Sequence, residues 1–110
     1  MTTKYFKEID DGKMDIDFLL KLDKAREIAG IPFKINSAFR TEEHNKKIGG
    51  SPNSSHLKGL AVDISVTNSR QRFIILNALI KVGFNRIGIA DTFIHVDDSK
   101  DKSQEVVWTY

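Results

Sequence analysis

The chain has 110 residues, of which 40% are hydrophobic and 29% are charged, an ordinary composition for one folded domain. Its 17 basic and 15 acidic residues give a net charge of +2, and they are interspersed, unlike the clustered Lys and Arg of a phosphate-binding surface. Cysteine is absent, which excludes disulfides and thiolate metal sites and limits metal ligands to His, Asp and Glu.

The chain is predicted to begin with a helix over residues 16–29. Apolar residues recur there at near-helical spacing, Asp15 stands where an N-terminal cap is expected, and Gly30 follows the last helical residue. The residues predicted to face the core are Ile16, Leu19, Leu20, Ala25 and Ile28.

A strand, a short helix and a loop are predicted next. "FKINSAF", residues 33–39, alternates apolar and polar residues as a half-buried strand does. Thr41 is placed to cap a short helix that runs through Ile48, with acidic residues in its first turn. "GGSPNSS", residues 49–55, combines turn-forming residues, and we interpret it as a loop that leads into a strand over residues 60–66.

A second long helix is predicted in the next segment. Either Asn68 or Ser69 caps its start, and Gly83 closes it. The apolar residues expected to face the core are Phe73, Ile74, Leu76, Leu79, Ile80 and Val82.

Three short strands are predicted to complete the fold. "RIGIA", residues 86–90, and "FIHVD", residues 93–97, are separated by two residues that suit a tight hairpin. The polar "KDKSQ" is a predicted loop, and "VVWTY", residues 106–110, is a predicted final strand that covers the sheet.

Together these elements predict an α+β fold, with helices flanking a small antiparallel sheet in one domain over residues 1–110. The sequence contains neither a signal-peptide core nor a run of 18 apolar residues. We therefore expect a protein made in the cytoplasm without a signal peptide and with no membrane partner.

His56, Asp63 and His95 are the residues best placed to share a site, because they come from one loop and two neighbouring strands. Two imidazoles and a carboxylate suit catalytic zinc, which keeps a fourth position open for water. A cation would also compensate a buried carboxylate, which is costly to desolvate alone. By spacing alone, the alternative is an ordinary hydrogen-bonded His with an Asp at a strand end.

The residues around this cluster resemble a known family. "INSAFRTEEHNKKIGGSPN", "SSHLKGLAVDI" and "FIHVD" together resemble the zinc D-alanyl-D-alanine carboxypeptidases, whose pattern runs Ser-x-His, Gly, Ala, x-Asp and a later His. The similarity extends over about residues 35–97. Relatives include vancomycin-resistance dipeptidases, phage endolysins that cut L-alanyl-D-glutamate bonds, and the Hedgehog signalling domain. The resemblance implies their fold, with the zinc site on the sheet.

Carried over residue by residue, the resemblance makes His56, Asp63 and His95 the zinc ligands. It makes Arg40 the arginine that contacts the substrate, polarising its carbonyl or binding its carboxylate, for which a planar guanidinium is suited. Ser54 matches the serine two residues before the first ligand, and is expected to bind substrate or to order the loop.

Other residues that match the family pattern are expected to shape the loop and turns around the site. Asn45 and the Gly49–Gly50 pair should position the loop, and Gly59 should permit a close turn between two ligands. Trp108 also fits the small phage and bacterial members. We interpret it as a packing residue, with the lining of a substrate groove as the alternative.

The resemblance leaves the general base open. Hydrolysis needs a carboxylate that takes a proton from water and passes it to the leaving amine. In many relatives this acid lies three residues before the last histidine, where this chain has Thr92. Asp91 is our first candidate for this catalytic role. Asp97 is the second, because it projects to the same side of its strand as His95, although it can instead orient a ligand imidazole.

The resemblance implies a zinc metallopeptidase that cuts the stem peptide of bacterial peptidoglycan, at D-Ala-D-Ala, at a cross-link, or between L-Ala and D-Glu. We expect peptidoglycan stem peptides as its partner, no nucleic acid, and a monomer. The lack of a signal peptide favours a phage or prophage endolysin that acts on the cell wall. Two alternatives remain: a non-hydrolytic, metal-stabilised binding or virion structural module, favoured by Thr92, and an intracellular D,D-dipeptidase.

Overall fold

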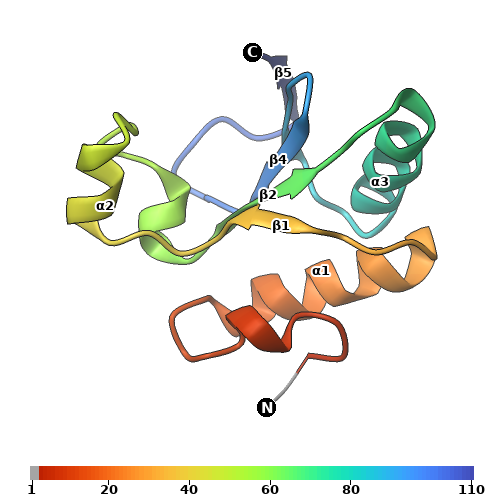
Figure 1. The fold of residues 1–110 in the computed structure, drawn as a ribbon, viewed down its shortest axis with the longest axis horizontal. Coiled ribbons are helices and arrows are strands. Elements are labelled where there is room, and N and C mark those ends of the chain that lie inside the picture. Colours follow the sequence, from red (N-terminus) through yellow and green to blue (C-terminus); the bar gives the residue numbers. More distant parts are fainter. Residues whose placement is uncertain (1–2) are drawn as a thin grey trace.

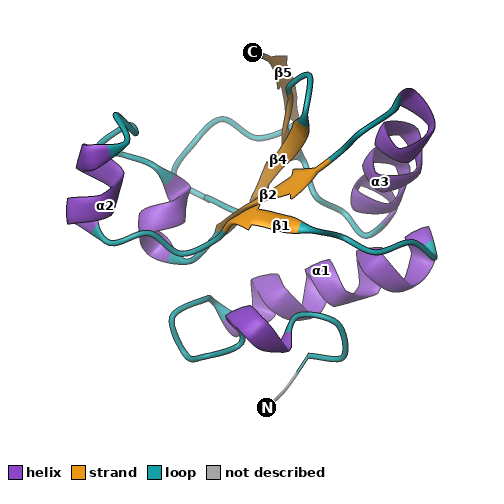
Figure 2. Ribbon diagram, viewed as in Figure 1, coloured by secondary structure: helices purple, strands orange, loops and turns teal. Residues whose placement is uncertain are grey.

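The computed structural model describes residues 3–110 and arranges them as a five-stranded sheet with helices around it (Figures 1 and 2). In chain order the elements are the 3-10 helix η1 (Lys7–Ile9), α1 (Ile16–Ala29), β1 (Ile35–Ser37), α2 (Glu42–Lys47), the 3-10 helix η2 (Ser55–Lys58), β2 (Ala61–Ser65), α3 (Ser69–Lys81), β3 (Arg86–Ile89), β4 (Phe93–Asp97) and β5 (Val106–Thr109). The predicted α+β class is confirmed. None of the helices within residues 3–110 is long and apolar enough to cross a membrane.

The strand order in the sheet is β1-β2-β4-β3-β5. The first four strands pair antiparallel, as predicted, but β5 runs parallel to β3. After β4 the chain reverses direction and passes β3. Its last strand, β5, then pairs with the outer edge of β3. β3 and β5 both run opposite to β4, so they are parallel to each other. The prediction of a wholly antiparallel sheet was wrong for this one pair of strands. β1 is three residues long, shorter than the predicted strand over residues 33–39.

The predicted helix boundaries follow from their caps. The side chains of Asp15, Thr41 and Asn68 each accept a hydrogen bond from the backbone N–H three residues later, which satisfies a donor that the first helical turn leaves free. Asn68, not Ser69, is therefore the cap of α3. Gly30 follows the last residue of α1 as its C-terminal cap, and its φ of 69° is the left-handed conformation that glycine adopts without strain.

One face of the sheet is covered by α1 and α3, which pack against each other (Figure 1). The fully buried strand residues of this core are Val62, Ile64, Ile87, Ile94 and Val96. The buried helix residues are Phe18, Leu19, Leu22, Ala25, Ile75, Ala78 and Leu79. Because side chains alternate along a strand, these apolar positions leave Asp63 and His95 on the opposite face.

The predicted core-facing stripes of the two long helices were partly wrong. In α3, Phe73 is 67% and Ile80 is 53% exposed, and in α1, Ile28 is 50% exposed. The buried residues of α3 have the expected helical spacing but are displaced around the helix, because residues 73–76 are all apolar and the spacing alone does not choose among them.

Candidate metal centre

A single row of residues crosses the whole sheet on the face opposite α1 and α3. Ser37 pairs with Asp63, Asp63 with His95, His95 with Gly88, and Gly88 with Trp108. Paired residues on neighbouring strands bring their side chains into contact on one face. The row therefore places two of the predicted ligands side by side.

η2 brings His56 to the same face. Its ring Nδ1 lies 2.7 Å from the carbonyl oxygen of Ala38, and its own carbonyl accepts a hydrogen bond from the Arg40 N–H at 3.1 Å. Ser54 Oγ accepts from the His56 N–H at 3.2 Å and caps η2. The observed contact of Ser54 thus matches the loop-ordering role, one of the two considered for it. An Nδ1–H that donates to Ala38 leaves Nε2 as the free lone pair of the His56 imidazole.

His56, Asp63 and His95 each offer one potential ligand atom, and these atoms lie within 4.8 Å of one another. Asp63 Oδ1 is 3.3 Å from His56 Nε2 and 2.9 Å from His95 Nδ1. Both imidazoles are buried, while Asp63 is half-buried. The structure brings together all three residues that the sequence predicts as zinc ligands.

The chemistry of this cluster fits a metal ion. Among residues 3–110, His56 Nε2 is the one buried side-chain nitrogen or oxygen without a hydrogen-bond partner, since its 3.3 Å approach to Asp63 is not aligned for one. Leaving a buried polar atom unpaired is costly, and a cation at this point would supply the missing partner. Two imidazole nitrogens and one carboxylate oxygen form a three-ligand set of the kind that catalytic zinc uses.

Asp97 and Arg86 lie behind His95. Asp97 Oδ2 is 2.7 Å from His95 Nε2, while its Oδ1 accepts from Arg86 Nε at 2.6 Å and from the Ser99 N–H at 3.1 Å. Burial raises the pKa of the Asp97 carboxyl, but hydrogen bonds with His95 and Arg86 outweigh it and hold the pKa below its usual range. With both oxygens engaged and 1% of the residue exposed, Asp97 is placed to orient the His95 ring. It is poorly placed to accept a proton from water.

The ligand cluster keeps Asp63 ionised. Burial raises the pKa of its carboxyl, but the adjacent imidazoles of His56 and His95 lower it by more, to well below the usual range. Burial lowers the pKa of His95, yet hydrogen bonds to Asp63 and Asp97 outweigh it and raise the pKa above its ordinary value. Carboxylates beside a ligand imidazole make it a better electron donor to a metal.

Arg40 reaches the cluster from beyond the end of β1. Its Nε donates to Ser37 Oγ at 3.3 Å, its Nη1 donates to Asn45 Oδ1 at 2.9 Å, and its Nη2 lies 3.8 Å from Asp63 Oδ2. A Cβ on Gly50 would collide with Asn45 Oδ1 and lie 3.0 Å from Arg40 Nη1. Asn45 is itself buried. Its Oδ1 holds the guanidinium, and its Nδ2 donates to the Ser51 carbonyl at 2.8 Å, which is the loop positioning expected from the sequence.

Asp91 and Thr92 lie exposed on the turn between β3 and β4. The Asp91 carbonyl accepts a hydrogen bond from Arg72 Nη2 at 2.7 Å, and Asp91 borders a surface pocket that Tyr110 also lines. Within residues 3–110, the cluster of potential ligands does not include Asp91.

Gly59 makes the close turn that joins η2 to β2, and we expect it to tolerate no side chain. Its φ is 69°, and an added Cβ would collide with the Lys13 carbonyl oxygen and lie 3.0 Å from Met14 Cα. Gly30 has the same φ with nothing within 4 Å. Both Gly→Ala changes should lose about 1–2 kcal/mol of unfolding free energy through backbone strain, and Gly59→Ala about 1–3 kcal/mol more through the collision. Urea denaturation measures both, and equal losses would contradict the expectation.

Sequence reasoning missed Arg86. It is buried, donates to Asp97, donates from Nη1 to the Ser103 carbonyl at 2.5 Å, and places its guanidinium 5.1 Å from the centre of the Trp108 ring. The available signal was an arginine at the start of an otherwise apolar strand, where a charged residue needs a buried partner.

Comparison with known proteins adds one finding. A family model described as Peptidase M15 matches residues 2–97, a range that contains Arg40 and all three potential ligands and ends before β5. No curated protein matches the chain.

Proposed function

The chain belongs to the peptidase M15 family of zinc peptidases, and from this premise we propose that it hydrolyses an amide bond in the stem peptide of bacterial peptidoglycan. The bonds considered are D-Ala-D-Ala, a cross-link, and L-Ala-D-Glu. The observation that carries the proposal is the convergence of His56, Asp63 and His95 around the unpartnered Nε2 of His56.

In this proposal the three residues hold zinc through two imidazole nitrogens and one carboxylate oxygen. Zinc supplies a Lewis acid that polarises a peptide carbonyl and lowers the pKa of water to about 7. Asp97 fixes the orientation of the His95 ring, and Arg86 holds Asp97 in turn.

Arg40 takes the role of substrate arginine. Ser37 and Asn45 hold two of its nitrogens, and its side chain is 13% exposed. The remaining N–H groups are available to a substrate oxygen, either the scissile carbonyl or a carboxylate. A guanidinium held in advance stabilises developing negative charge without reorganising.

Asp91 remains our candidate for the general base, because both oxygens of Asp97 are engaged. The turn that carries Asp91 has to bring its carboxylate towards the substrate for this role. We propose that the protein acts on the cell wall, where the stem peptide is found.

The proposed function is tested by incubating the zinc-loaded protein with purified muropeptides and following the products by mass spectrometry. We expect products that disappear with a chelator and return with zinc, and their masses identify the bond. Absence of products from several wall chemotypes, at stoichiometric bound zinc, would contradict the proposal.

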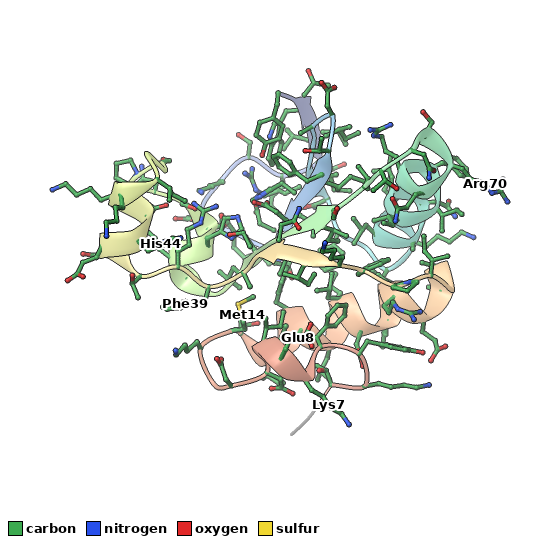
Figure 3. All side chains as sticks on the ribbon, viewed as in Figure 1. Lys7, Glu8, Met14, Phe39, His44 and Arg70 are labelled. Atoms are coloured by element: carbon green, nitrogen blue, oxygen red, sulfur yellow. The ribbon has the colours of Figure 1, made fainter. Side chains whose placement is uncertain are left out.

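Arg40→Lys should lower kcat/KM for the cleaved muropeptide about 10- to 100-fold, because Lys keeps the charge but loses the planar fork. Arg70→Lys is the matched control, since Arg70 is exposed and projects from α3 away from the sheet (Figure 3). Equal kcat/KM for the two variants would remove Arg40 from the substrate site.

A second candidate is a non-hydrolytic binding or virion module with the same metal-stabilised fold. Thr92 at the position of the missing acid, together with the engaged oxygens of Asp97, favours it. Bound zinc and bound muropeptide without any cleavage are its expected results. The intracellular D,D-dipeptidase differs from both by cleaving free D-Ala-D-Ala.

A further inference from the structure

We propose that Trp108 and Tyr110, here called the aromatic wall, bind the substrate on the side of the metal centre opposite Arg40. This proposal rests on the proposed function and adds to it a specificity-determining surface. The family model matches the chain only as far as residue 97, so the match does not include these two residues, although Trp108 fits the pattern of the small phage and bacterial members.

The aromatic wall stands on the same face of the sheet as the ligands. A Cβ on Gly88 would lie 2.5 Å from Trp108 Nε1 and 2.8 Å from Tyr110 Cε1. Since Gly88 pairs directly with His95, both rings lie over the position next to a ligand. The missing side chain at Gly88 is what lets them approach it.

Each ring of the aromatic wall packs on a residue of β4. The centre of the Trp108 ring lies 5.6 Å from that of His95, and the centre of the Tyr110 ring lies 5.1 Å from that of Phe93. Trp108 is half-buried, while Tyr110 is 70% exposed. Trp108 is therefore held beside the ligand, and Tyr110 presents an aromatic face to solvent at the edge of the site.

The strand order sets the direction in which a substrate would lie. Arg40 follows β1 at one edge of the sheet, and the aromatic wall lies on and directly after β5 at the other, with Asp63 and His95 between them. A peptide lying across the strands would place an anionic group at Arg40 and its scissile bond at the ligands. Its other flank would then reach the rings of the aromatic wall.

The chemistry of the aromatic wall selects a group that is apolar on one face and polar at its edge. Tyr and Trp combine an apolar ring with a hydrogen-bond donor. Desolvation raises the pKa of the Tyr110 phenol above its ordinary value, which is already well above neutral pH, so the hydroxyl is protonated. In peptidoglycan, both the alanine-bearing stem peptide and the ring face of the attached sugar have this character.

Tyr110→Ala is the first test, because an exposed ring can be removed without disturbing the core. Val107→Ala is the matched control, since Val107 is also exposed and alternation along β5 points it to the opposite face. We expect Tyr110→Ala to raise KM about 5- to 10-fold with kcat little changed, and Val107→Ala to change neither. Tyr110→Phe removes the hydroxyl and keeps the ring, so its KM shows which of the two groups contributes to binding.

The two sources of the bound group are separated by comparing a sugar-bearing muropeptide with the same stem peptide after removal of its sugar. A KM increase for both substrates assigns the aromatic wall to the peptide, and an increase for the sugar-bearing one alone assigns it to the sugar. Unchanged KM for both substrates in Tyr110→Ala would overturn the proposal.

Trp108 provides a second readout that does not depend on catalysis. It is the one tryptophan in the chain, so the emission of the zinc-loaded protein reports the aromatic wall alone when muropeptide is added. Cleavage with neither an emission change nor a KM effect overturns the aromatic wall and leaves the proposed function standing. An emission change that weakens in Tyr110→Ala, without cleavage, supports the aromatic wall and overturns hydrolysis. Neither cleavage nor an emission change overturns both.

Discussion

Asp63→Asn is expected to abolish zinc retention and muropeptide cleavage together. The amide keeps the shape of the side chain but removes the negative charge that lies between His56 and His95. Even residues that only support ligands cost 10- to 100-fold in metal affinity when changed, so loss of a direct ligand should weaken zinc binding by more than about 100-fold. Metal analysis of the purified protein, with a muropeptide assay alongside, measures both effects.

Asp17→Asn is the control for this change, because Asp17 is exposed in the first turn of α1, away from the ligand face. It should keep one zinc per chain and full activity. If Asp63→Asn cleaved muropeptides without zinc, or kept zinc at full affinity, the assignment of the metal centre would be wrong.

Asp97→Asn is expected to have the second largest effect, on stability as well as on metal affinity. The change removes one partner of the buried pair with Arg86 and the carboxylate that faces His95 Nε2. Removing one member of a buried ion pair costs about 3–5 kcal/mol, and losing the support of a ligand costs about 10- to 100-fold in zinc affinity. Urea denaturation and competition with a zinc indicator measure the two losses.

Asp98→Asn is a closely matched control, because it removes the same charge one residue later. Asp98 pairs with Lys21, and its side chain is more exposed than that of Asp97, so we expect a loss below about 1 kcal/mol and unchanged zinc affinity. Comparing the Asp97→Asn and Asp98→Asn variants also tests the two roles considered for Asp97. If Asp97 were the general base, Asp97→Asn would lower kcat while zinc affinity stayed normal.

The potential ligands could be predicted because the residues around them resemble the zinc D-alanyl-D-alanine carboxypeptidases. The spacing of His56 and Asp63 alone left an ordinary hydrogen-bonded pair as the alternative. The caps Asp15 and Thr41 were also predicted, and Asn68 was one of two candidates, because a cap depends on residues that are close in the sequence.

Features that depend on long-range packing could not be predicted in the same way. The apolar run in α3 did not reveal which side would face α1. The pairing of β5 with the outer edge of β3, on which the contact of Arg86 with Trp108 depends, leaves no local pattern. The role of Asp97 could be stated only as one of two possibilities, because it depends on which groups form hydrogen bonds with its carboxylate oxygens.

The placement of β5 also decides which backbone groups the sheet leaves open at its edge. β3 is buried along nearly all of its length, and without β5 its outer edge would offer unpaired backbone groups to a strand from another molecule. β5 occupies that edge and itself alternates half-buried with exposed residues, and such a short, partly solvated strand is a weaker template for pairing. The last strand thus covers the outer edge of β3 through the same pairing that brings Trp108 to the ligand face.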